Sequence, residues 1–197
     1  MKTDIVRIGN EDALQLALRE ASRASVYNEL SARSALHLQL LTEEVMGMIR
    51  SIAGDPAGEF WIEGEAGVFQ LHLKVETSMD DKKRQQLLSA SSTGKNEATR
   101  SFMGKLRAVF EFICGNGDDA LFANPLMMGD GARMYGTMVW SMKEYEQSVR
   151  QLLGEKREGA EEAWDELEKS VVSHVADDVR VSIQGNEAEL IVIKKMA

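Results

Sequence analysis

The sequence predicts an α+β fold, a two-layer α/β sandwich in which helices cover one face of a largely antiparallel sheet. Three observations support this prediction. Two pairs of strand-like segments are each contiguous in the sequence and joined by a short turn, which favours antiparallel pairing. Segments with helical periodicity precede both pairs. The length of 197 residues suits one domain, residues 1–197, with a sizeable hydrophobic core.

The first half of the chain begins with a strand and two helices. The apolar run "TDIVRI" ends at Gly9 and Asn10, as a first strand would. Asn10 is an expected N-cap for a helix over 11–27, because its side-chain oxygen can accept from a free backbone N–H. A second helix is expected over 31–53, where the glycine and proline of "GDPAG" end it.

Two strand-like segments follow these helices. "EFWIEGE" and "VFQLHLKVET" alternate in character and are joined by Ala66 and Gly67, which is a hairpin signal. From Asp80 to Asn124 the pattern is polar and dotted with glycine, and it is interpreted as a long lid-like excursion, about 80–124.

The second half repeats the use of helices and a hairpin. A glycine-rich stretch after Pro125 leads into a helix that ends near "LLGEK", and "GAEEAWDELEKSVVSHVADD" reads as one charged amphipathic helix. The chain closes with "DVRVSIQGNEAELIVIKK", a hairpin around Gly185 and Asn186. No internal repeat is evident in the sequence. The predicted order is therefore β-α-α-β-β, excursion, helices, β-β.

Composition excludes several classes of function. The net charge of -9 argues against nucleic acid or an anionic membrane as the main partner. No apolar run approaches the roughly 20 residues that cross a bilayer, and the N-terminal stretch does not resemble a signal peptide, so a cytoplasmic location is expected. The single cysteine and three histidines show no metal-ligand spacing, so no metal site is predicted.

The helix around "LTEEVMGMIRS" carries the candidate site. At the helical period its core face consists of Leu38, Leu41, Val45, Met48, Ile49 and Ile52. Glu43 points away from this arc, whereas Glu44 lies on its border, where a carboxylate could hang over a pocket. Gly47 costs a helix interior about 1 kcal/mol relative to alanine. Two interpretations stay open: Glu44 and Gly47 serve a ligand, or Glu44 is an ordinary boundary residue and Gly47 a packing contact.

This helix, with "L-x-x-E-E" followed by isoleucine, resembles the motif-bearing helix of the GHKL (histidine kinase-like) ATPase superfamily. The similarity is closest to the anti-sigma-factor serine kinases, and the order of strands and helices is similar too. The resemblance implies a GHKL/Bergerat-like fold, a protein partner in signalling, and ATP or ADP as ligand. It implies that Glu44 is the general base, and it places Met48 where the family has an asparagine that holds magnesium. A thioether is a poor ligand for this hard cation, so magnesium is doubtful.

Two further elements of the site follow from the same resemblance. Glu76, or less readily Asp80, stands near the position of the aspartate that recognises adenine. The glycine-rich loop that holds phosphates corresponds to "GDGARMYG", with Gly129, Gly131, Gly136 and Arg133. The alternative for this loop is a plain glycine-rich turn before a helix.

Three functions are compatible with these residues. One is an active anti-sigma-factor-like serine kinase or ATPase. The second is a divergent nucleotide-binding or pseudo-ATPase module that regulates a protein partner, and a homodimer is compatible with it. The third is an unrelated α+β domain. The losses at Met48 and after Glu76 favour the regulatory module, so enzymatic activity is left uncertain.

Overall fold

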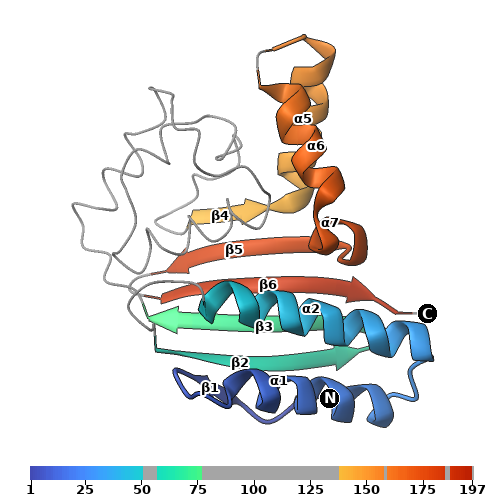
Figure 1. Ribbon diagram of the computed structural model, residues 1–197, viewed down its shortest axis with the longest axis vertical. Coiled ribbons are helices and arrows are strands. Elements are labelled where there is room, and N and C mark those ends of the chain that lie inside the picture. Colours follow the sequence, from blue (N-terminus) through green and yellow to red (C-terminus); the bar gives the residue numbers. More distant parts are fainter. Residues whose placement is uncertain (51–56, 77–137, 158, 185–186, 197) are drawn as a thin grey trace.

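The computed structural model describes residues 1–50, 57–76, 138–157, 159–184 and 187–196 (Figure 1). The expected excursion over about 80–124 lies outside these residues. The strands are β1 (Val6–Ile8), β2 (Gly58–Glu65), β3 (Val68–Glu76), β4 (Met138–Ser141), β5 (Asp178–Gln184) and β6 (Glu187–Lys195). The helices are α1 (Ala13–Tyr27), α2 (Ala32–Arg50), α5 (Met142–Gly154), α6 (Ala160–Lys169) and α7 (Val171–Val175).

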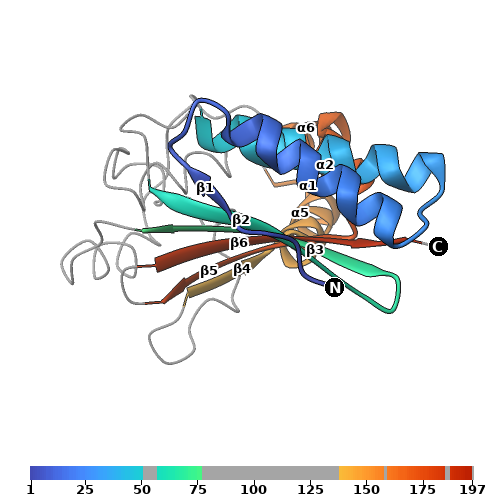
Figure 2. The ribbon, with the colours of Figure 1, turned by 90° about the horizontal axis from the view of Figure 1, so that it is seen from below.

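The strands form one six-stranded sheet in the order β1-β2-β3-β6-β5-β4, and every pair is antiparallel. Helices α1 and α2 lie side by side over one face of the sheet (Figure 2). The hairpin of α5 and α6 extends past the β4 edge (Figure 1). No described helix lies over the opposite face of β2, β3 and β6, which is called the open face below. The predicted two-layer sandwich is thus confirmed.

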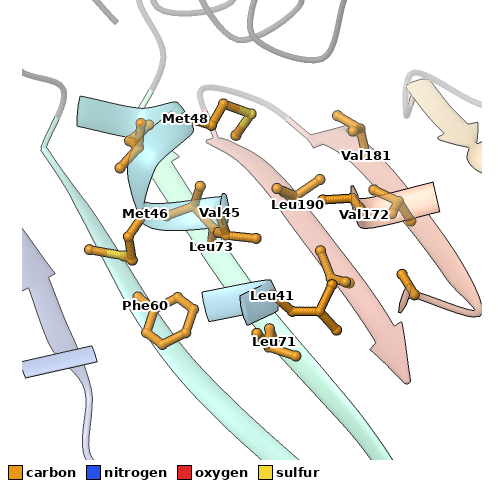
Figure 3. Close-up of a cluster of buried hydrophobic side chains, with 14 of the residues drawn as sticks. Leu41, Val45, Met46, Met48, Phe60, Leu71, Leu73, Val172, Val181 and Leu190 are labelled. Atoms are coloured by element: carbon orange, nitrogen blue, oxygen red, sulfur yellow. The ribbon is translucent and has the colours of Figure 1, made fainter. Parts of the chain in front are cut away.

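The core lies between the sheet and α2, and the predicted face of this helix is confirmed. Its buried residues are Leu38, Leu41, Thr42, Val45, Met46, Met48 and Ile49, while Ile52 falls outside the described residues. Thr42 and Met46 were not predicted to be buried. They are covered because α1 packs beside α2, so a wider face of α2 is buried than the sheet alone would cover. Met46 lies next to Phe60 of β2 (Figure 3).

The start of α1 corrects one prediction. Asn10 does not cap the helix with its side chain. The helix begins at Ala13 with Asp12 as the N-cap residue, and the backbone N–H of Ala13 donates to the carbonyl of Asn10. Gly9 has a φ of 103°, so the chain makes a turn before the helix starts.

The second half departs from the sequence prediction in two places. The glycine-rich entry leads first into the short strand β4, which pairs with β5 at the sheet edge, and only then into α5. The expected single helix over 159–178 is divided at Ser170, which has extended backbone angles and caps α7 by accepting from the N–H of Ser173. The break lets Val172 enter the core.

The architecture contains a repeat that the sequence does not reveal. Each half has, in chain order, a strand, helices and a β-hairpin, and the two hairpins meet through β3 and β6 in the middle of the sheet. His72 and Ile191 are each the fifth residue after the turn of their hairpin, and they face one another across the two strands. A pseudo-twofold axis therefore passes between them.

Candidate functional site

Those expected site residues that the structure describes lie at one end of the sheet. There β3 ends at Glu76 and β6 begins at Glu187, directly opposite. β4 also begins at this end, because Met138 pairs with Ile183 near the end of β5. The C-terminal half of α2 runs above it (Figure 1). The topology thus brings together the expected positions on α2 and at the end of β3.

The two glutamates of α2 are placed as the periodicity predicts. Glu43 is exposed and Glu44 is half-buried. Glu44 precedes Met48 by one helical turn, so both residues lie on the same flank of the helix. The Glu44 carboxylate therefore stands at the boundary between the core and the surface, where a carboxylate can act on a ligand bound beside α2.

Met48 is part of the hydrophobic core. Its side chain is 5% exposed and points away from Met46, over the end of the sheet where β6 begins (Figure 3). A thioether in this position contributes packing and does not offer the oxygen ligand that magnesium requires. Met48 therefore cannot hold a magnesium ion as an asparagine at this position would.

Gly47 has open space around it. A Cβ built on this residue meets no heavy atom within 4 Å among the described residues, and the glycine is exposed. The part of the chain that the structure describes therefore supplies no packing contact that would require glycine here. The alternative interpretation, close approach of a ligand to the helix, is compatible with this geometry.

Glu76 stands at an acidic corner of the sheet. It is exposed and lies opposite Glu187, whose carboxylate is 2.8 Å from Nζ of Lys74. This hydrogen bond raises the pKa of Lys74, so the lysine stays charged and balances one of the two carboxylates. Among the described residues no cation is paired with Glu76, and its exposed carboxylate can accept hydrogen bonds from an amino group on a ligand.

The other expected residues cannot be placed. Gly129, Gly131, Arg133 and Gly136 lie outside the described residues, and so does Asp80. The structure therefore brings Glu44, Gly47, Met48 and Glu76 to one end of the sheet and leaves the phosphate-binding loop as a prediction.

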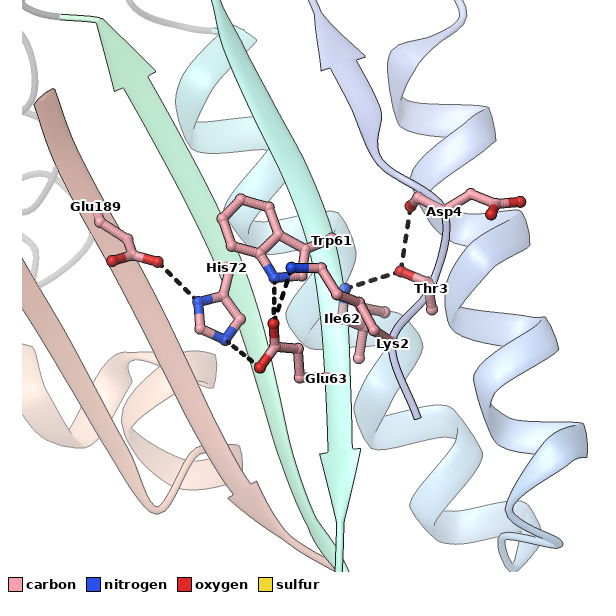
Figure 4. Close-up of polar contacts among 8 residues, drawn as sticks. All are labelled: Lys2, Thr3, Asp4, Trp61, Ile62, Glu63, His72 and Glu189. Carbon is pink, nitrogen blue, oxygen red and sulfur yellow. Dashed lines mark hydrogen bonds and ion pairs between the residues drawn. The ribbon is translucent and has the colours of Figure 1, made fainter.

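A polar cluster on the open face was not predicted from the sequence. His72 of β3 lies between two carboxylates, with Nδ1 2.8 Å from Oε1 of Glu189 and Nε2 3.8 Å from Oε2 of Glu63 (Figure 4). Its ring is stacked on Trp61, with ring centroids 4.8 Å apart and planes inclined by 6°. Lys2 completes the cluster through an ion pair of 3.0 Å with Glu63.

A signal for part of this cluster was present in the sequence. The hairpin turn at Ala66 and Gly67 sets Trp61 opposite His72, and Glu63 is two residues from Trp61 on the same face. The indole N–H of Trp61 donates to Glu63 over 2.9 Å. The hydrogen bond from Lys2, followed by that from Trp61, holds the pKa of Glu63 below its ordinary value.

Comparisons with known proteins add no family assignment. No family model matches this chain, and no curated protein or solved structure is significantly similar to it. Within the described ranges, no helix is long and apolar enough to cross a membrane. Those ranges also hold no group of three or more His, Cys, Asp or Glu side chains placed to bind a metal ion.

Proposed function

We propose that this protein is a divergent GHKL-like regulatory module with a degenerate nucleotide site that acts through a protein partner in signalling. The observation that supports the proposal is the convergence at one end of the sheet. The helix carrying Glu44 and Gly47 lies above the end of β3, and β4, which follows the glycine-rich stretch in the sequence, begins at the same end. The order of strand, two helices and hairpin in the first half, and of helices followed by a hairpin in the second, also supports the proposal, whereas the short strand β4 before α5 is an addition to the expected order.

The ligand of this site is ATP or ADP. Glu76 supplies an exposed acceptor for the adenine amino group, the open space beside Gly47 admits the nucleotide, and the glycine-rich loop with Arg133 holds the phosphates. Because Met48 replaces the magnesium-holding asparagine, binding is weak and independent of magnesium.

A second candidate is an active anti-sigma-factor-like serine kinase or ATPase. The observation that favours it is Glu44, a half-buried glutamate on the flank of α2 at the site end of the sheet. A carboxylate in this position can take the proton of an attacking hydroxyl or water. The buried thioether of Met48 favours the regulatory module over this alternative.

Calorimetric titration with ATP and with ADP, each with and without magnesium, tests the proposal. We expect weak binding of both nucleotides, with the same affinity when magnesium is removed. Glu76→Gln should lower the affinity, whereas the exposed Glu43→Gln on the outer side of α2 should leave it unchanged. Micromolar binding that depends on magnesium, accompanied by release of phosphate, would establish the kinase or ATPase instead.

A further inference from the structure

His72 occupies a position in which both of its ring nitrogens meet carboxylates. The side chain is 9% exposed although it lies on the open face, and its buried Nε2 has no hydrogen-bond partner among the described residues. Nδ1 contacts Glu189 of β6, and Nε2 faces Glu63 of β2 from 3.8 Å, too far for a hydrogen bond but close enough for an ion pair (Figure 4). One side chain of β3 thus links both neighbouring strands.

The hydrogen-bonding capacity of imidazole decides which form suits this position. Carboxylates only accept hydrogen bonds, and a neutral imidazole has a single N–H to donate. If Nδ1 of neutral His72 donates to Glu189, the lone pair of Nε2 faces an oxygen of Glu63, which is repulsive. The doubly protonated ring directs an N–H toward each carboxylate. The parallel Trp61 ring adds an attraction for a cation.

The charged groups around His72 come from several elements. Glu63 lies on β2, Glu189 on β6, and Lys2 in the N-terminal segment, where its Nζ is 3.0 Å from Glu63 and 4.5 Å from the centroid of the Trp61 ring. Lys74, two residues farther along β3, is paired with Glu187. On β5, Arg180 pairs with Asp178. The nearest charged groups in the described part of the chain are thus two carboxylates and one ammonium, and an imidazolium balances their charge.

Glu63 also connects the cluster to the N-terminal segment. Residues 1–3 lie along the second half of β2, where the N–H of Gly64 donates to the carbonyl of Met1 and the N–H of Thr3 to that of Ile62, both over 2.9 Å. Lys2 pairs with Glu63 between these two bonds. The charge on His72 therefore acts on the carboxylate that holds this segment.

We propose that His72 is a proton-dependent clasp: the doubly protonated ring joins Glu63 to Glu189, and loss of one proton loosens the attachment of residues 1–3 to β2. This device does not depend on the nucleotide site. The ring reaches both carboxylates with an N–H only while it carries both protons, so the clasp forms at lower pH and is lost at higher pH. The clasp also requires that both carboxylates are ionised, and this requirement sets the lower limit of the pH range in which it forms.

Amide hydrogen exchange of the full chain tests the clasp. Protection factors of the Thr3 and Gly64 amides, corrected for intrinsic exchange, are compared with those of Ala21 in α1, from about pH 5.5 to about pH 8. We expect the protection of Thr3 and Gly64 relative to Ala21 to fall by about fivefold or more over this range. His72→Gln, which cannot gain a charge, should show no such fall.

Two carboxylate variants separate the clasp from general effects of charge. In Glu63→Gln the side-chain amide can donate to the bare Nε2 of neutral His72, so the loss of protection at high pH should disappear. Glu65→Gln changes the same charge on the same face of β2 and should keep the wild-type pH dependence. Nitrogen NMR of the His72 ring in the wild type reports the form directly, independently of the variants. A bare Nε2 throughout the range, or equal pH dependence in wild type and His72→Gln, would overturn the proposal.

Discussion

Gly64 and Phe69 oppose one another across β2 and β3, and the ring of Phe69 occupies the space that a side chain at Gly64 would need. A Cβ built on Gly64 would lie 2.9 Å from Cε1 of Phe69. Phe69 is 1% exposed, so its ring has little freedom to move aside. The glycine is therefore required by packing.

Replacement of Gly64 by alanine should consequently destabilise the protein. We expect Gly64→Ala to lower the free energy of unfolding by about 1–3 kcal/mol through overpacking. Phe69→Leu removes the ring edge, so in the double variant the added cost of the alanine should shrink. Denaturant unfolding of the four proteins measures this coupling. An additive double variant would show that the ring does not restrict position 64.

Gly47 differs from Gly64, because nothing among the described residues surrounds it. Gly47→Ala should stabilise α2 by about 0.5–1 kcal/mol, as expected for a helix interior. If the glycine admits a nucleotide, the same variant should bind ATP more weakly in calorimetric titration. Gly154→Ala, at the end of α5 and likewise without neighbours, should leave binding unchanged. Unchanged ATP affinity in Gly47→Ala would remove Gly47 from the site.

Val45 and Glu43 lie on opposite faces of α2, one buried and one exposed. Val45 is 1% exposed in the core, whereas Glu43 is exposed. Val45→Asp should unfold the protein, since an unpaired buried charge costs several kcal/mol against a typical stability of about 5–15 kcal/mol. Glu43→Ala should change stability by less than about 0.5 kcal/mol. Thermal melts followed by circular dichroism measure both, and the reverse order would contradict the assigned core face.

Much of the fold could be predicted because its signals are local. The turn at Ala66 and Gly67 sets the register of the first hairpin, and helical periodicity defines the buried face of α2. β4 was missed because it has only four residues after a glycine-rich stretch, and its stability comes from pairing with β5 rather than from its own sequence. The break at Ser170 was missed for a similar reason, since helical periodicity continues across it while packing of Val172 divides the helix.

The candidate site shows the same division. The positions of Glu43 and Glu44 follow from helical periodicity and are confirmed. The contact between His72 and Glu189 could not be predicted, because Glu189 lies 117 residues away and reaches His72 only if β6 pairs with β3. This pairing joins the two halves of the chain, and no local pattern specifies it.

Glu63 provides a pH prediction at the acid end. The hydrogen bonds from Lys2 and Trp61 lower the pKa of Glu63 in the folded protein. The ionised carboxylate therefore stabilises the fold at pH values above the pKa of glutamate in the unfolded chain, about 4.3. This stabilisation is lost as the pH falls through the lower pKa of the folded state. The effect should stay below about 1 kcal/mol, because the side chain is 42% exposed and solvent screens the pair. The difference in unfolding free energy between wild type and Glu63→Gln should therefore shrink between about pH 5 and about pH 3.

The last prediction concerns Met48 and depends on the proposed function. If loss of a magnesium ligand is what separates this site from an active one, restoring one oxygen should have a measurable effect. Met48→Asn should raise the magnesium-dependent affinity for ATP, because an amide oxygen can contact the ion directly or through water. The variant should lose about 1–3 kcal/mol of stability, since Met48 is 5% exposed and the amide replaces core packing.

Met48→Leu is the matched control, because it keeps the volume and the apolar character of the side chain and adds no oxygen. Its affinity for ATP should equal that of the wild type with and without magnesium, and it should retain nearly full stability in thermal melts. Calorimetry on the three proteins then isolates the effect of the amide. A folded Met48→Asn variant without any gain would mean that the site has diverged at more than this residue. Glu44 would then be an ordinary charged residue at the boundary of a core helix, in a module that binds a protein partner. The reason is that an amide at position 48, one helical turn from Glu44, would have failed to restore magnesium binding.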